Sequence, residues 1–263
     1  MATKAAGGKK NISKKLPIFV KTRTHYYICN DPKCDKKHSG SYTDYWDLVK
    51  LAEFPVCYVD EIDFESDNIY ICSPINGEYN IQKKRKCKLI HWLLERPSEG
   101  LKVDDRFDET WISDRWFASL VPTAKYVTLG TDYRLRKGDL LHKKKYDFIH
   151  LSYLTDRRKR VIDDLAGRGF SFAPNSWGEE RHIALCSSNA MLALHQDEYP
   201  VIEPLRYALA SAYHLPILAE FSRDFYPFKI YKEYPSIIKL VWLENKNPLD
   251  EDYQFKKCIM EAL

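Results

Sequence analysis

Residues Ser187–Glu220 have the sequence SSNAMLALHQDEYPVIEPLRYALASAYHLPILAE, and this stretch gives the strongest indication of the fold. Ala190–Leu194 is an apolar run of strand length, and the polar loop His195–Pro200 follows it. Ile202–Tyr213 has apolar residues at helical spacing, and Pro216–Ala219 is a second apolar run. A strand, a helix and a second strand in this order predict a βαβ unit of a parallel sheet.

The same alternation extends over the rest of the chain, which favours an α/β protein. In the first half we expect strands at Pro17–Lys21, His25–Cys29, Val56–Val59, Asn68–Cys72, Lys88–Leu94, Thr110–Ser113 and Tyr126–Leu129, with helices at Tyr42–Glu53 and Asp114–Leu120. In the second half we expect further strands at Asp147–Leu151 and Phe170–Ala173, and helical segments at Thr155–Ala166, Glu179–Ser187, Ile237–Glu244 and Tyr253–Ala262.

The pattern restarts after a charged stretch, so we expect two compact Rossmann-like domains that face a cleft. The expected division is a disordered basic arm over 1–16, an N-terminal Rossmann-like domain over 17–131, a linker over 132–145, a C-terminal Rossmann-like domain over 146–250 and a C-terminal helix over 251–263.

Composition is typical of a globular chain, with 44% hydrophobic and 30% charged residues among 263. No run approaches the roughly 20 apolar residues that span a bilayer, so we expect no membrane partner. The basic N-terminus has no apolar stretch behind it and does not resemble a secretory signal. Seven scattered cysteines favour reduced thiols and a cytoplasmic protein, in the host cytoplasm if the source is viral.

The segment after the strand Asp147–Leu151 is one candidate anion site. A helix that starts near Thr155 would direct its N-terminus toward the carboxyl end of the strand, where a phosphate can bind. We therefore take Ser152, Thr155, Arg157 and Arg158 as donor-binding candidates. The alternative is that the two arginines belong to the polar face of a surface helix.

The loop after Ala190–Leu194 is the second candidate. His195 and Glu198 lie in the loop, and Glu203 and Arg206 lie three residues apart at the start of the next helix. A carboxylate can accept the ribose hydroxyls of a nucleotide, while a guanidinium can bind its phosphate. The alternative is an i,i+3 surface ion pair worth a few tenths of a kcal/mol.

With these motifs in hand, Ser187–Glu220 resembles the donor-binding signature of GT-B glycosyltransferases of the group-1 and spore-maturation-like type, and DFIHLSYLTDRRKRVIDDL resembles the first βα unit of the same domain. The resemblance implies transfer of a sugar from a nucleotide sugar, with UDP-glucose favoured and no further cofactor. There are two departures. Many retaining members carry two glutamates seven residues apart, but counting from Glu198 the second position is Arg206. A glycine that usually precedes the last strand is absent from Tyr213-His214-Leu215-Pro216.

The resemblance implies that the N-terminal domain is the acceptor domain. An inverting transfer needs a general base there, whereas a retaining transfer does not. Acidic and histidine residues that could fill this role are Asp44, Asp47, Glu78, His91 and Glu95, of which we take Asp44, Glu78 and Glu95 as the catalytic candidates. Asp44 is also a good first-turn acid for its helix. No metal is expected, since no Asp-x-Asp stands in a loop after an expected apolar strand and Cys29, Cys34 and His38 supply only three ligands.

Basic residues occur in runs, which bears on the acceptor. Lys83, Lys84, Arg85 and Lys86 form one run that can attract a polyanion, although a single run is more often solvated surface. The resemblance includes phage-type enzymes that glucosylate hydroxymethylated DNA, so a DNA acceptor is kept open beside a glycan or a small molecule. A non-catalytic nucleic-acid-binding module is the alternative from another class.

Overall fold

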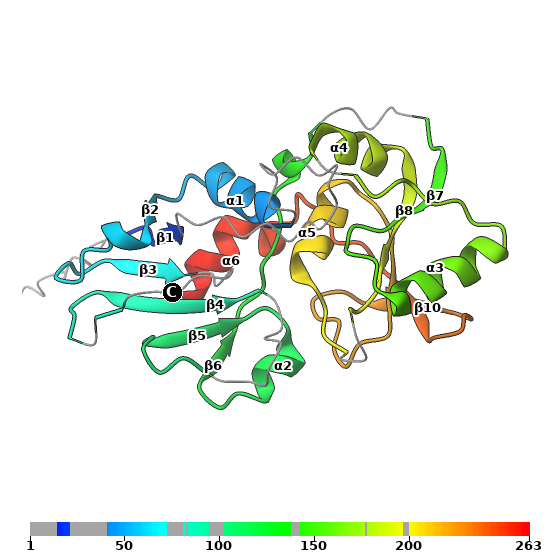
Figure 1. Ribbon diagram of the computed structural model, residues 1–263. Coiled ribbons are helices and arrows are strands. Elements are labelled where there is room, and N and C mark those ends of the chain that lie inside the picture. Colours follow the sequence, from blue (N-terminus) through cyan, green and yellow to red (C-terminus); the bar gives the residue numbers. More distant parts are fainter. Residues whose placement is uncertain are drawn as a thin grey trace, which may run out of the picture.

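The computed structural model describes residues 15–21, 41–72, 81–82, 84–94, 103–137, 143–176, 178–196 and 200–263. It contains two sheets that lie side by side, each with helices packed against it (Figure 1). The predicted α/β architecture with two Rossmann-like domains is confirmed. Each domain is described below from its own sheet.

The N-terminal sheet has six strands, all parallel, in the order β2-β1-β3-β4-β5-β6. Its elements are β1 (Ile18–Lys21), α1 (Ser41–Leu51), β2 (Val56–Tyr58), β3 (Ile69–Cys72), β4 (Lys88–Leu93), β5 (Glu109–Ile112), α2 (Arg115–Ser119) and β6 (Ala124–Tyr126), with a 3-10 turn at Val59–Glu61. The chain crosses from β1 to β2 in one direction and then returns past β1 to β3. This reversal is the strand order of doubly wound nucleotide-binding folds.

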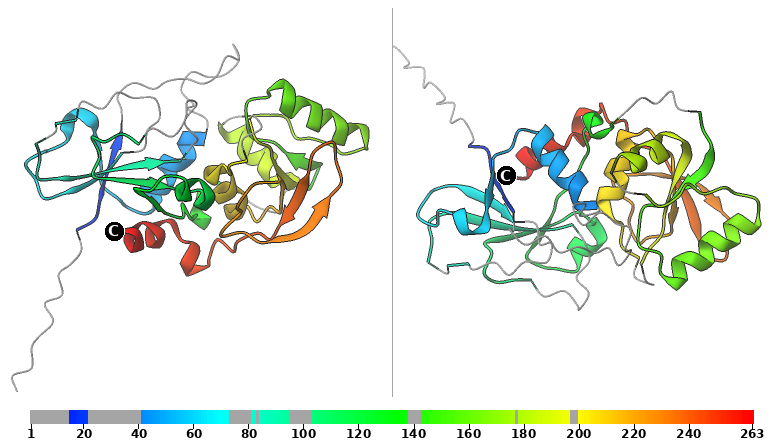
Figure 2. Two further views of the ribbon diagram at one scale, coloured as in Figure 1. Left: turned by 90° about the horizontal axis from the view of Figure 1, so that it is seen from below. Right: turned by 45° about the horizontal axis from the view of Figure 1, so that its top comes forward.

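Residues that alternate along each strand cover the two faces of this sheet. Helix α1 packs on one face together with α6 (Phe255–Ala262), the last helix of the chain. The Phe255 ring stacks on Trp92 of β4 with ring centres 6.1 Å apart. The chain therefore leaves the C-terminal domain and ends against the N-terminal sheet, as both views of Figure 2 show.

The C-terminal sheet has five strands in the order β10-β11-β9-β8-β7. Its elements are β7 (Tyr146–Ile149), α3 (Asp156–Gly167), α4 (Gly178–Cys186), β8 (Ser188–Ala193), α5 (Pro204–Ala212), β9 (Ile217–Glu220), β10 (Ile230–Tyr234) and β11 (Leu240–Leu243). Strands β7, β8 and β9 are parallel, whereas β11 runs antiparallel to both β9 and β10. An additional parallel bridge joins Phe148 to Phe172 on the outer side of β7.

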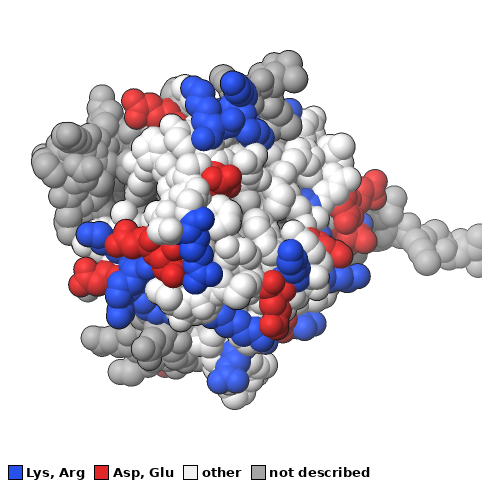
Figure 3. Space-filling model, turned by 90° about the vertical axis from the view of Figure 1, so that its right-hand side faces the viewer, with Lys and Arg blue, Asp and Glu red and all other residues white. Residues whose placement is uncertain are grey.

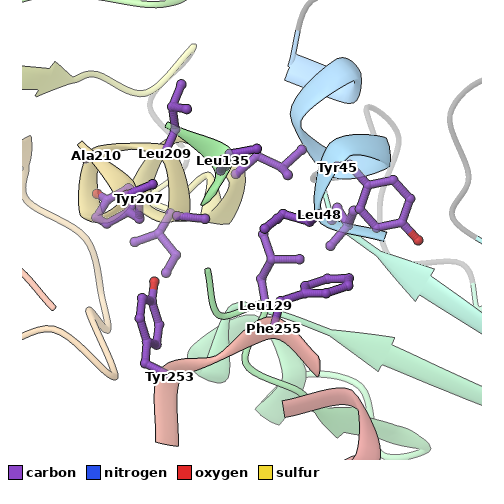
Figure 4. Close-up of a cluster of buried hydrophobic side chains, with 14 of the residues drawn as sticks. Tyr45, Leu48, Leu129, Leu135, Tyr207, Leu209, Ala210, Tyr253 and Phe255 are labelled. Atoms are coloured by element: carbon purple, nitrogen blue, oxygen red, sulfur yellow. The ribbon is translucent and has the colours of Figure 1, made fainter. Parts of the chain in front are cut away.

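One hydrophobic core continues from one domain into the other. Tyr45 and Leu48 of α1 belong to the same buried cluster as Tyr207 and Leu209 of α5. Leu135, from the 3-10 turn Tyr133–Leu135, is also part of this cluster (Figure 4). The segment that the sequence suggested as a linker thus contributes a buried side chain to the domain junction.

One predicted helix is wrong. Ile237–Glu244 contains strand β11, which pairs with β9 from Leu240↔Glu220 to Leu243↔Ile217. The run IIKLVWLE is apolar apart from Lys239 and Glu244, so its periodicity cannot separate a buried strand from a buried helix. Its β-branched and aromatic residues favour a strand, and β9 has an open edge for it to pair with.

Three smaller differences concern the ends of elements. The expected strand Phe170–Ala173 is reduced to the single bridge at Phe172. Strand β6 ends at Tyr126, where the predicted strand began. Helix α5 begins at Pro204 rather than Ile202, because Pro is favoured in the first helical position and Glu203 takes the N-cap position.

Candidate functional site

At the carboxyl edge of the C-terminal sheet, the order in which the chain adds strands reverses between β7 and β8. From β7 the chain goes outward to Phe172 and then returns past β7 to β8. In open α/β sheets, ligands bind in the crevice at such a reversal, outside the carboxyl ends of the strands. The segments that follow β7 and β8 carry the residues predicted to bind the donor, so the fold places them at the position expected for a ligand.

Arg158 of α3 lies at the centre of this edge and is 1% exposed. Its Nε donates to the carbonyl oxygens of Leu194 (3.2 Å) and His195 (3.1 Å). One terminal nitrogen donates to the Ser152 hydroxyl and to the Tyr153 carbonyl at 2.9 Å. The other donates to Leu194 O at 2.9 Å and to Oε1 of Glu203 at 2.8 Å. This guanidinium therefore joins the loops that follow both strands.

Arg206 reaches the same place from α5. Its terminal nitrogens donate to Leu194 O at 3.2 Å and to the Ser152 hydroxyl at 2.6 Å. It also pairs with Oε2 of Glu203. The predicted i,i+3 pair thus exists, but the Arg206 side chain is 9% exposed and the Glu203 side chain 31% exposed. This is a buried arginine that supports a partly exposed carboxylate, which differs from a surface ion pair.

The third arginine, Arg157, pairs with Glu220 at the end of β9, where one contact measures 2.7 Å. Glu220 also accepts the backbone N–H of His195 at 3.0 Å. The His195 ring is buried, and its Nε2 lies 3.0 Å from the Ser222 hydroxyl. Sequence analysis did not identify Glu220, although an acid at the end of an apolar strand marks the same sheet edge.

The structure brings together every predicted donor-binding residue that it describes. Thr155 is the N-cap of α3, and its hydroxyl accepts the Arg158 backbone N–H at 3.3 Å. Ser152 lies between the two buried arginines. Glu198 is outside the described residues. The cluster therefore unites the ends of β7, β8 and β9 with the starts of α3 and α5.

Burial controls the protonation of this cluster. It lowers the pKa of Arg158 to about 10, with the neighbouring Arg206 acting in the same direction, so the guanidinium remains charged at neutral pH. Burial also lowers the pKa of His150 to about 3 and that of His195 below its usual value. His150 donates its Nδ1–H to Leu192 O (2.9 Å), and its buried Nε2 has no hydrogen-bond partner among the described residues. Both histidines are neutral at physiological pH.

The carboxyl edge of the N-terminal sheet faces this cluster. Asp114, which follows β5, accepts the Ile202 backbone N–H at 3.0 Å. Arg115 pairs with Asp224 at 2.6 Å, and its guanidinium lies 4.5 Å from the centre of the Tyr226 ring. Both contacts join segments that follow parallel strands of different sheets. The two carboxyl edges therefore face each other, as the two halves of a shared site would.

Asp44 is the one predicted catalytic residue that the structure describes, and it does not lie at the facing carboxyl edges. Asp44 is 2% exposed, and its carboxylate accepts two hydrogen bonds from Arg181 of α4, at 2.6 and 3.0 Å. The carboxylate thus joins α1 to the other domain inside the junction, where an acceptor hydroxyl has no access to it. Glu78 and Glu95 lie outside the described residues.

The predicted acceptor-binding run lies away from the facing edges. Lys84, Arg85 and Lys86 precede β4, so they are at the amino edge of the N-terminal sheet. The Arg85 side chain is 8% exposed and pairs with Asp108 at 2.9 Å, while Lys86 is 3.5 Å from Glu65. Lys83 is outside the described residues. Figure 3 shows a different face, on the side of the C-terminal domain, where basic and acidic side chains of the described residues are interspersed.

Two further features are absent from the described ranges. No group of three or more His, Cys, Asp or Glu side chains there could hold a metal ion, while Cys29, Cys34 and His38 fall outside those ranges. No helix in the described part of the chain is long and apolar enough to cross a membrane.

Comparisons with known proteins add a structural likeness. No family model matches the sequence, and no curated protein matches it. Among solved structures, the chain is similar to the crystal structure of AviGT4, a glycosyltransferase involved in Avilamycin A biosynthesis. The identity is 10% and the TM-score 0.49, over 81% of this chain and 86% of that chain. A likeness at this level does not bear on chemistry, which is argued below from the site.

Proposed function

We propose that the protein is a glycosyltransferase of GT-B type that moves a sugar from a nucleotide-sugar donor to an acceptor hydroxyl. The observation that supports this most is the polar cluster at the β7/β8 reversal, opposite the carboxyl edge of a second parallel sheet. A donor at this reversal would face an acceptor held by the other domain. Transfer between two bound substrates requires such an arrangement.

The cluster offers groups suited to both ends of a nucleoside diphosphate. The Glu203 carboxylate is partly exposed and can accept ribose hydroxyls. The start of α3, capped by Thr155, lies at the sheet edge and favours an anion, as helix N-termini do. Arg157 is near this helix start, with a side chain 21% exposed. The diphosphate would therefore lie along the start of α3, with the ribose toward α5.

Donor binding tests the proposal directly. Purified protein is titrated with UDP-glucose, GDP-sugars and ADP-sugars, and thermal unfolding and calorimetric binding are followed. A ligand at 100 times its Kd stabilises a protein by about 2.7 kcal/mol, so one nucleotide should raise Tm by several degrees. We expect UDP-glucose to give the largest shift and Glu203→Ala to abolish it. If no nucleotide sugar binds, the protein is not a transferase of this type.

Beside the facing edges, cations lie over aromatic rings, at the domain boundary and within the C-terminal domain. Arg223 lies 5.8 Å from the centre of the Trp116 ring, and Lys239 lies 4.3 Å from that of Phe221. Rings and cations in alternation favour an acceptor with flat groups and negative charge, such as a nucleic acid. This keeps hydroxymethylated DNA among the acceptors to be tried, although the run Lys84–Lys86 lies at the opposite edge.

Mass spectrometry separates the acceptor classes. UDP-glucose is incubated with the protein and either hydroxymethylated or plain DNA, and the nucleosides are analysed for an added hexose. Hexose on the hydroxymethylated sample alone supports a DNA acceptor. Tight, salt-dependent binding of both DNAs, without any nucleotide-sugar binding, instead supports the non-catalytic nucleic-acid-binding module.

A further inference from the structure

We infer that Arg158 is a positioning residue that holds Glu203 in place for the donor, and that it does not bind the donor phosphates itself. This inference rests on the proposed function. The sequence suggested a phosphate ligand, since Arg158 is at the start of a helix beside a sheet edge. The contacts of its guanidinium indicate a different role.

The hydrogen-bonding capacity of Arg158 is fully used inside the protein. A guanidinium has five N–H groups, one on Nε and two on each terminal nitrogen. Nε serves the carbonyls of Leu194 and His195. One terminal nitrogen donates to Ser152 and Tyr153, and the other donates to Leu194 and Glu203. At 1% exposure, no N–H is left to bind a phosphate.

Among the described residues, two buried arginines hold Glu203 by its carboxylate. Its side chain is at the N-cap of α5 but makes no capping hydrogen bond to that helix. Instead Oε1 accepts from Arg158 at 2.8 Å, and Oε2 accepts from Arg206. Each carboxylate oxygen has two acceptor positions, and the side chain remains 31% exposed. The two arginines therefore leave one acceptor position on each oxygen unused by the residues that the structure describes.

A rigid carboxylate with two unused acceptor positions suits a pair of neighbouring hydroxyls. The 2′ and 3′ hydroxyls of a ribose form such a pair, and each can donate one hydrogen bond. Two buried cations that fix an exposed anion are costly for stability alone, since burying charged groups carries a desolvation penalty. If the two arginines fix Glu203 for a ligand, their function explains why they are buried despite this penalty. A free phosphate or a deoxyribose would not use both oxygens.

Lysine cannot replace Arg158 in this role, although it keeps the charge. An ammonium is a single point donor, whereas the planar fork of Arg158 joins four residues besides Glu203. In Arg158→Lys, the Glu203 carboxylate would retain a cationic neighbour but lose its fixed orientation. Preference for ribose over deoxyribose should then fall, while attraction for the diphosphate should persist.

The test compares the Kd values of UDP and 2′-deoxy-UDP by calorimetry. A hydrogen bond to a charged group is worth about 1.5–3 kcal/mol, so the wild type should prefer UDP by about tenfold or more. In Arg158→Lys the ratio should fall to within about twofold of one. Glu203→Gln, which keeps the shape of the side chain, should lower the ratio too. Arg168→Lys is the matched control on α3, because Arg168 pairs with Asp164 away from this site.

The outcomes separate this inference from the proposed function. If the wild type binds neither nucleotide and none of the UDP-, GDP- and ADP-sugars, both are wrong. If the wild type binds UDP and 2′-deoxy-UDP equally, the role of Arg158 is wrong and the donor proposal stands. A wild-type ratio in Arg158→Lys also contradicts the inference. If Arg158→Lys does not fold, Glu203→Gln decides, because an unchanged ratio in that variant leaves Arg158 with no carboxylate to position for the ribose.

Discussion

At the scale of single residues, His214 has a backbone that favours glycine. It follows α5 with a φ of 53°, in the left-handed region where a Cβ atom is unfavourable. Its side chain is exposed, so little packing depends on it. His214→Gly should therefore raise the free energy of unfolding by about 0.5–1 kcal/mol, measured by urea denaturation. His214→Ala keeps the Cβ atom and is the control. An equal gain in both variants would show that the imidazole, and not the backbone, is unfavourable.

The residues of the candidate site were largely predictable one at a time, but their partners were not. Arg157, Arg158 and Arg206 were identified because they follow apolar strands, and the fold does gather them. Arg158 donates its hydrogen bonds to Leu194, His195 and Glu203 because α3 and α5 approach the same sheet edge. A single sequence does not reveal how close these two helices come to the sheet edge. The same is true of Asp44, whose partner Arg181 lies in the other domain.

At the scale of elements, the passage of the chain between domains depends on Gly130. Its φ is +69°, and a Cβ atom there would lie 2.8 Å from the Tyr253 carbonyl oxygen. Backbone hydrogen bonds of 2.8 Å join Thr131 to both Tyr253 and Phe255 at this crossing. Gly130→Ala should cost about 2 kcal/mol or more, because both the backbone conformation and the close approach are lost.

Gly167 offers the matched control for Gly130. It is the last residue of α3, and a Cβ atom there meets nothing within 4 Å. Gly167→Ala should leave the free energy of unfolding unchanged or raise it by up to about 1 kcal/mol, since alanine favours a helix more than glycine does. Urea denaturation of the two variants side by side tests this. Equal destabilisation would mean that the crossing at Gly130 is not special.

Most elements were predictable from local pattern, and the exceptions share a physical cause. The strand–helix–strand unit from β8 to β9 has a clear change of period, and it forms as expected. Strand β11 was assigned to a helix, because its apolar run has no polar side and its pairing partner β9 is distant in sequence. Phe172 makes one bridge where a strand was expected, so the outer edge of β7 is short.

At the scale of the whole molecule, the domains are joined by a buried ion pair in addition to the shared core. Asp44 and Arg181 have side chains 4% and 5% exposed. Removing one partner leaves an uncompensated buried charge, so Asp44→Leu or Arg181→Met alone should cost about 3–5 kcal/mol. The double variant should recover most of this loss, since apolar pairs of similar size replace buried ion pairs well. Additive losses, measured by urea denaturation, would show that the two side chains do not act as a pair.

The same pair should make the stability of the molecule depend on pH. Burial raises the pKa of Asp44 from 3.8 to about 6, against the opposing attraction of Arg181. Between these values the folded state binds more protons than the unfolded chain, so the free energy of unfolding should fall as pH rises from about 4 to about 6. The shift corresponds to roughly 3 kcal/mol.

Asp44→Asn isolates this contribution, because its side chain does not titrate. His182, whose pKa burial lowers to about 4, titrates in the same range but is present in both proteins. The free energy of unfolding of both proteins is measured in urea at several pH values from 4 to 7. The wild type should become less stable relative to Asp44→Asn as pH rises, so the difference between the two values should shift. The shift should level off between pH 6, where Asp44 is half ionised, and pH 7, where it is almost fully ionised. A difference that moves in the opposite direction would mean that Arg181 outweighs burial and holds the carboxylate charged throughout this range.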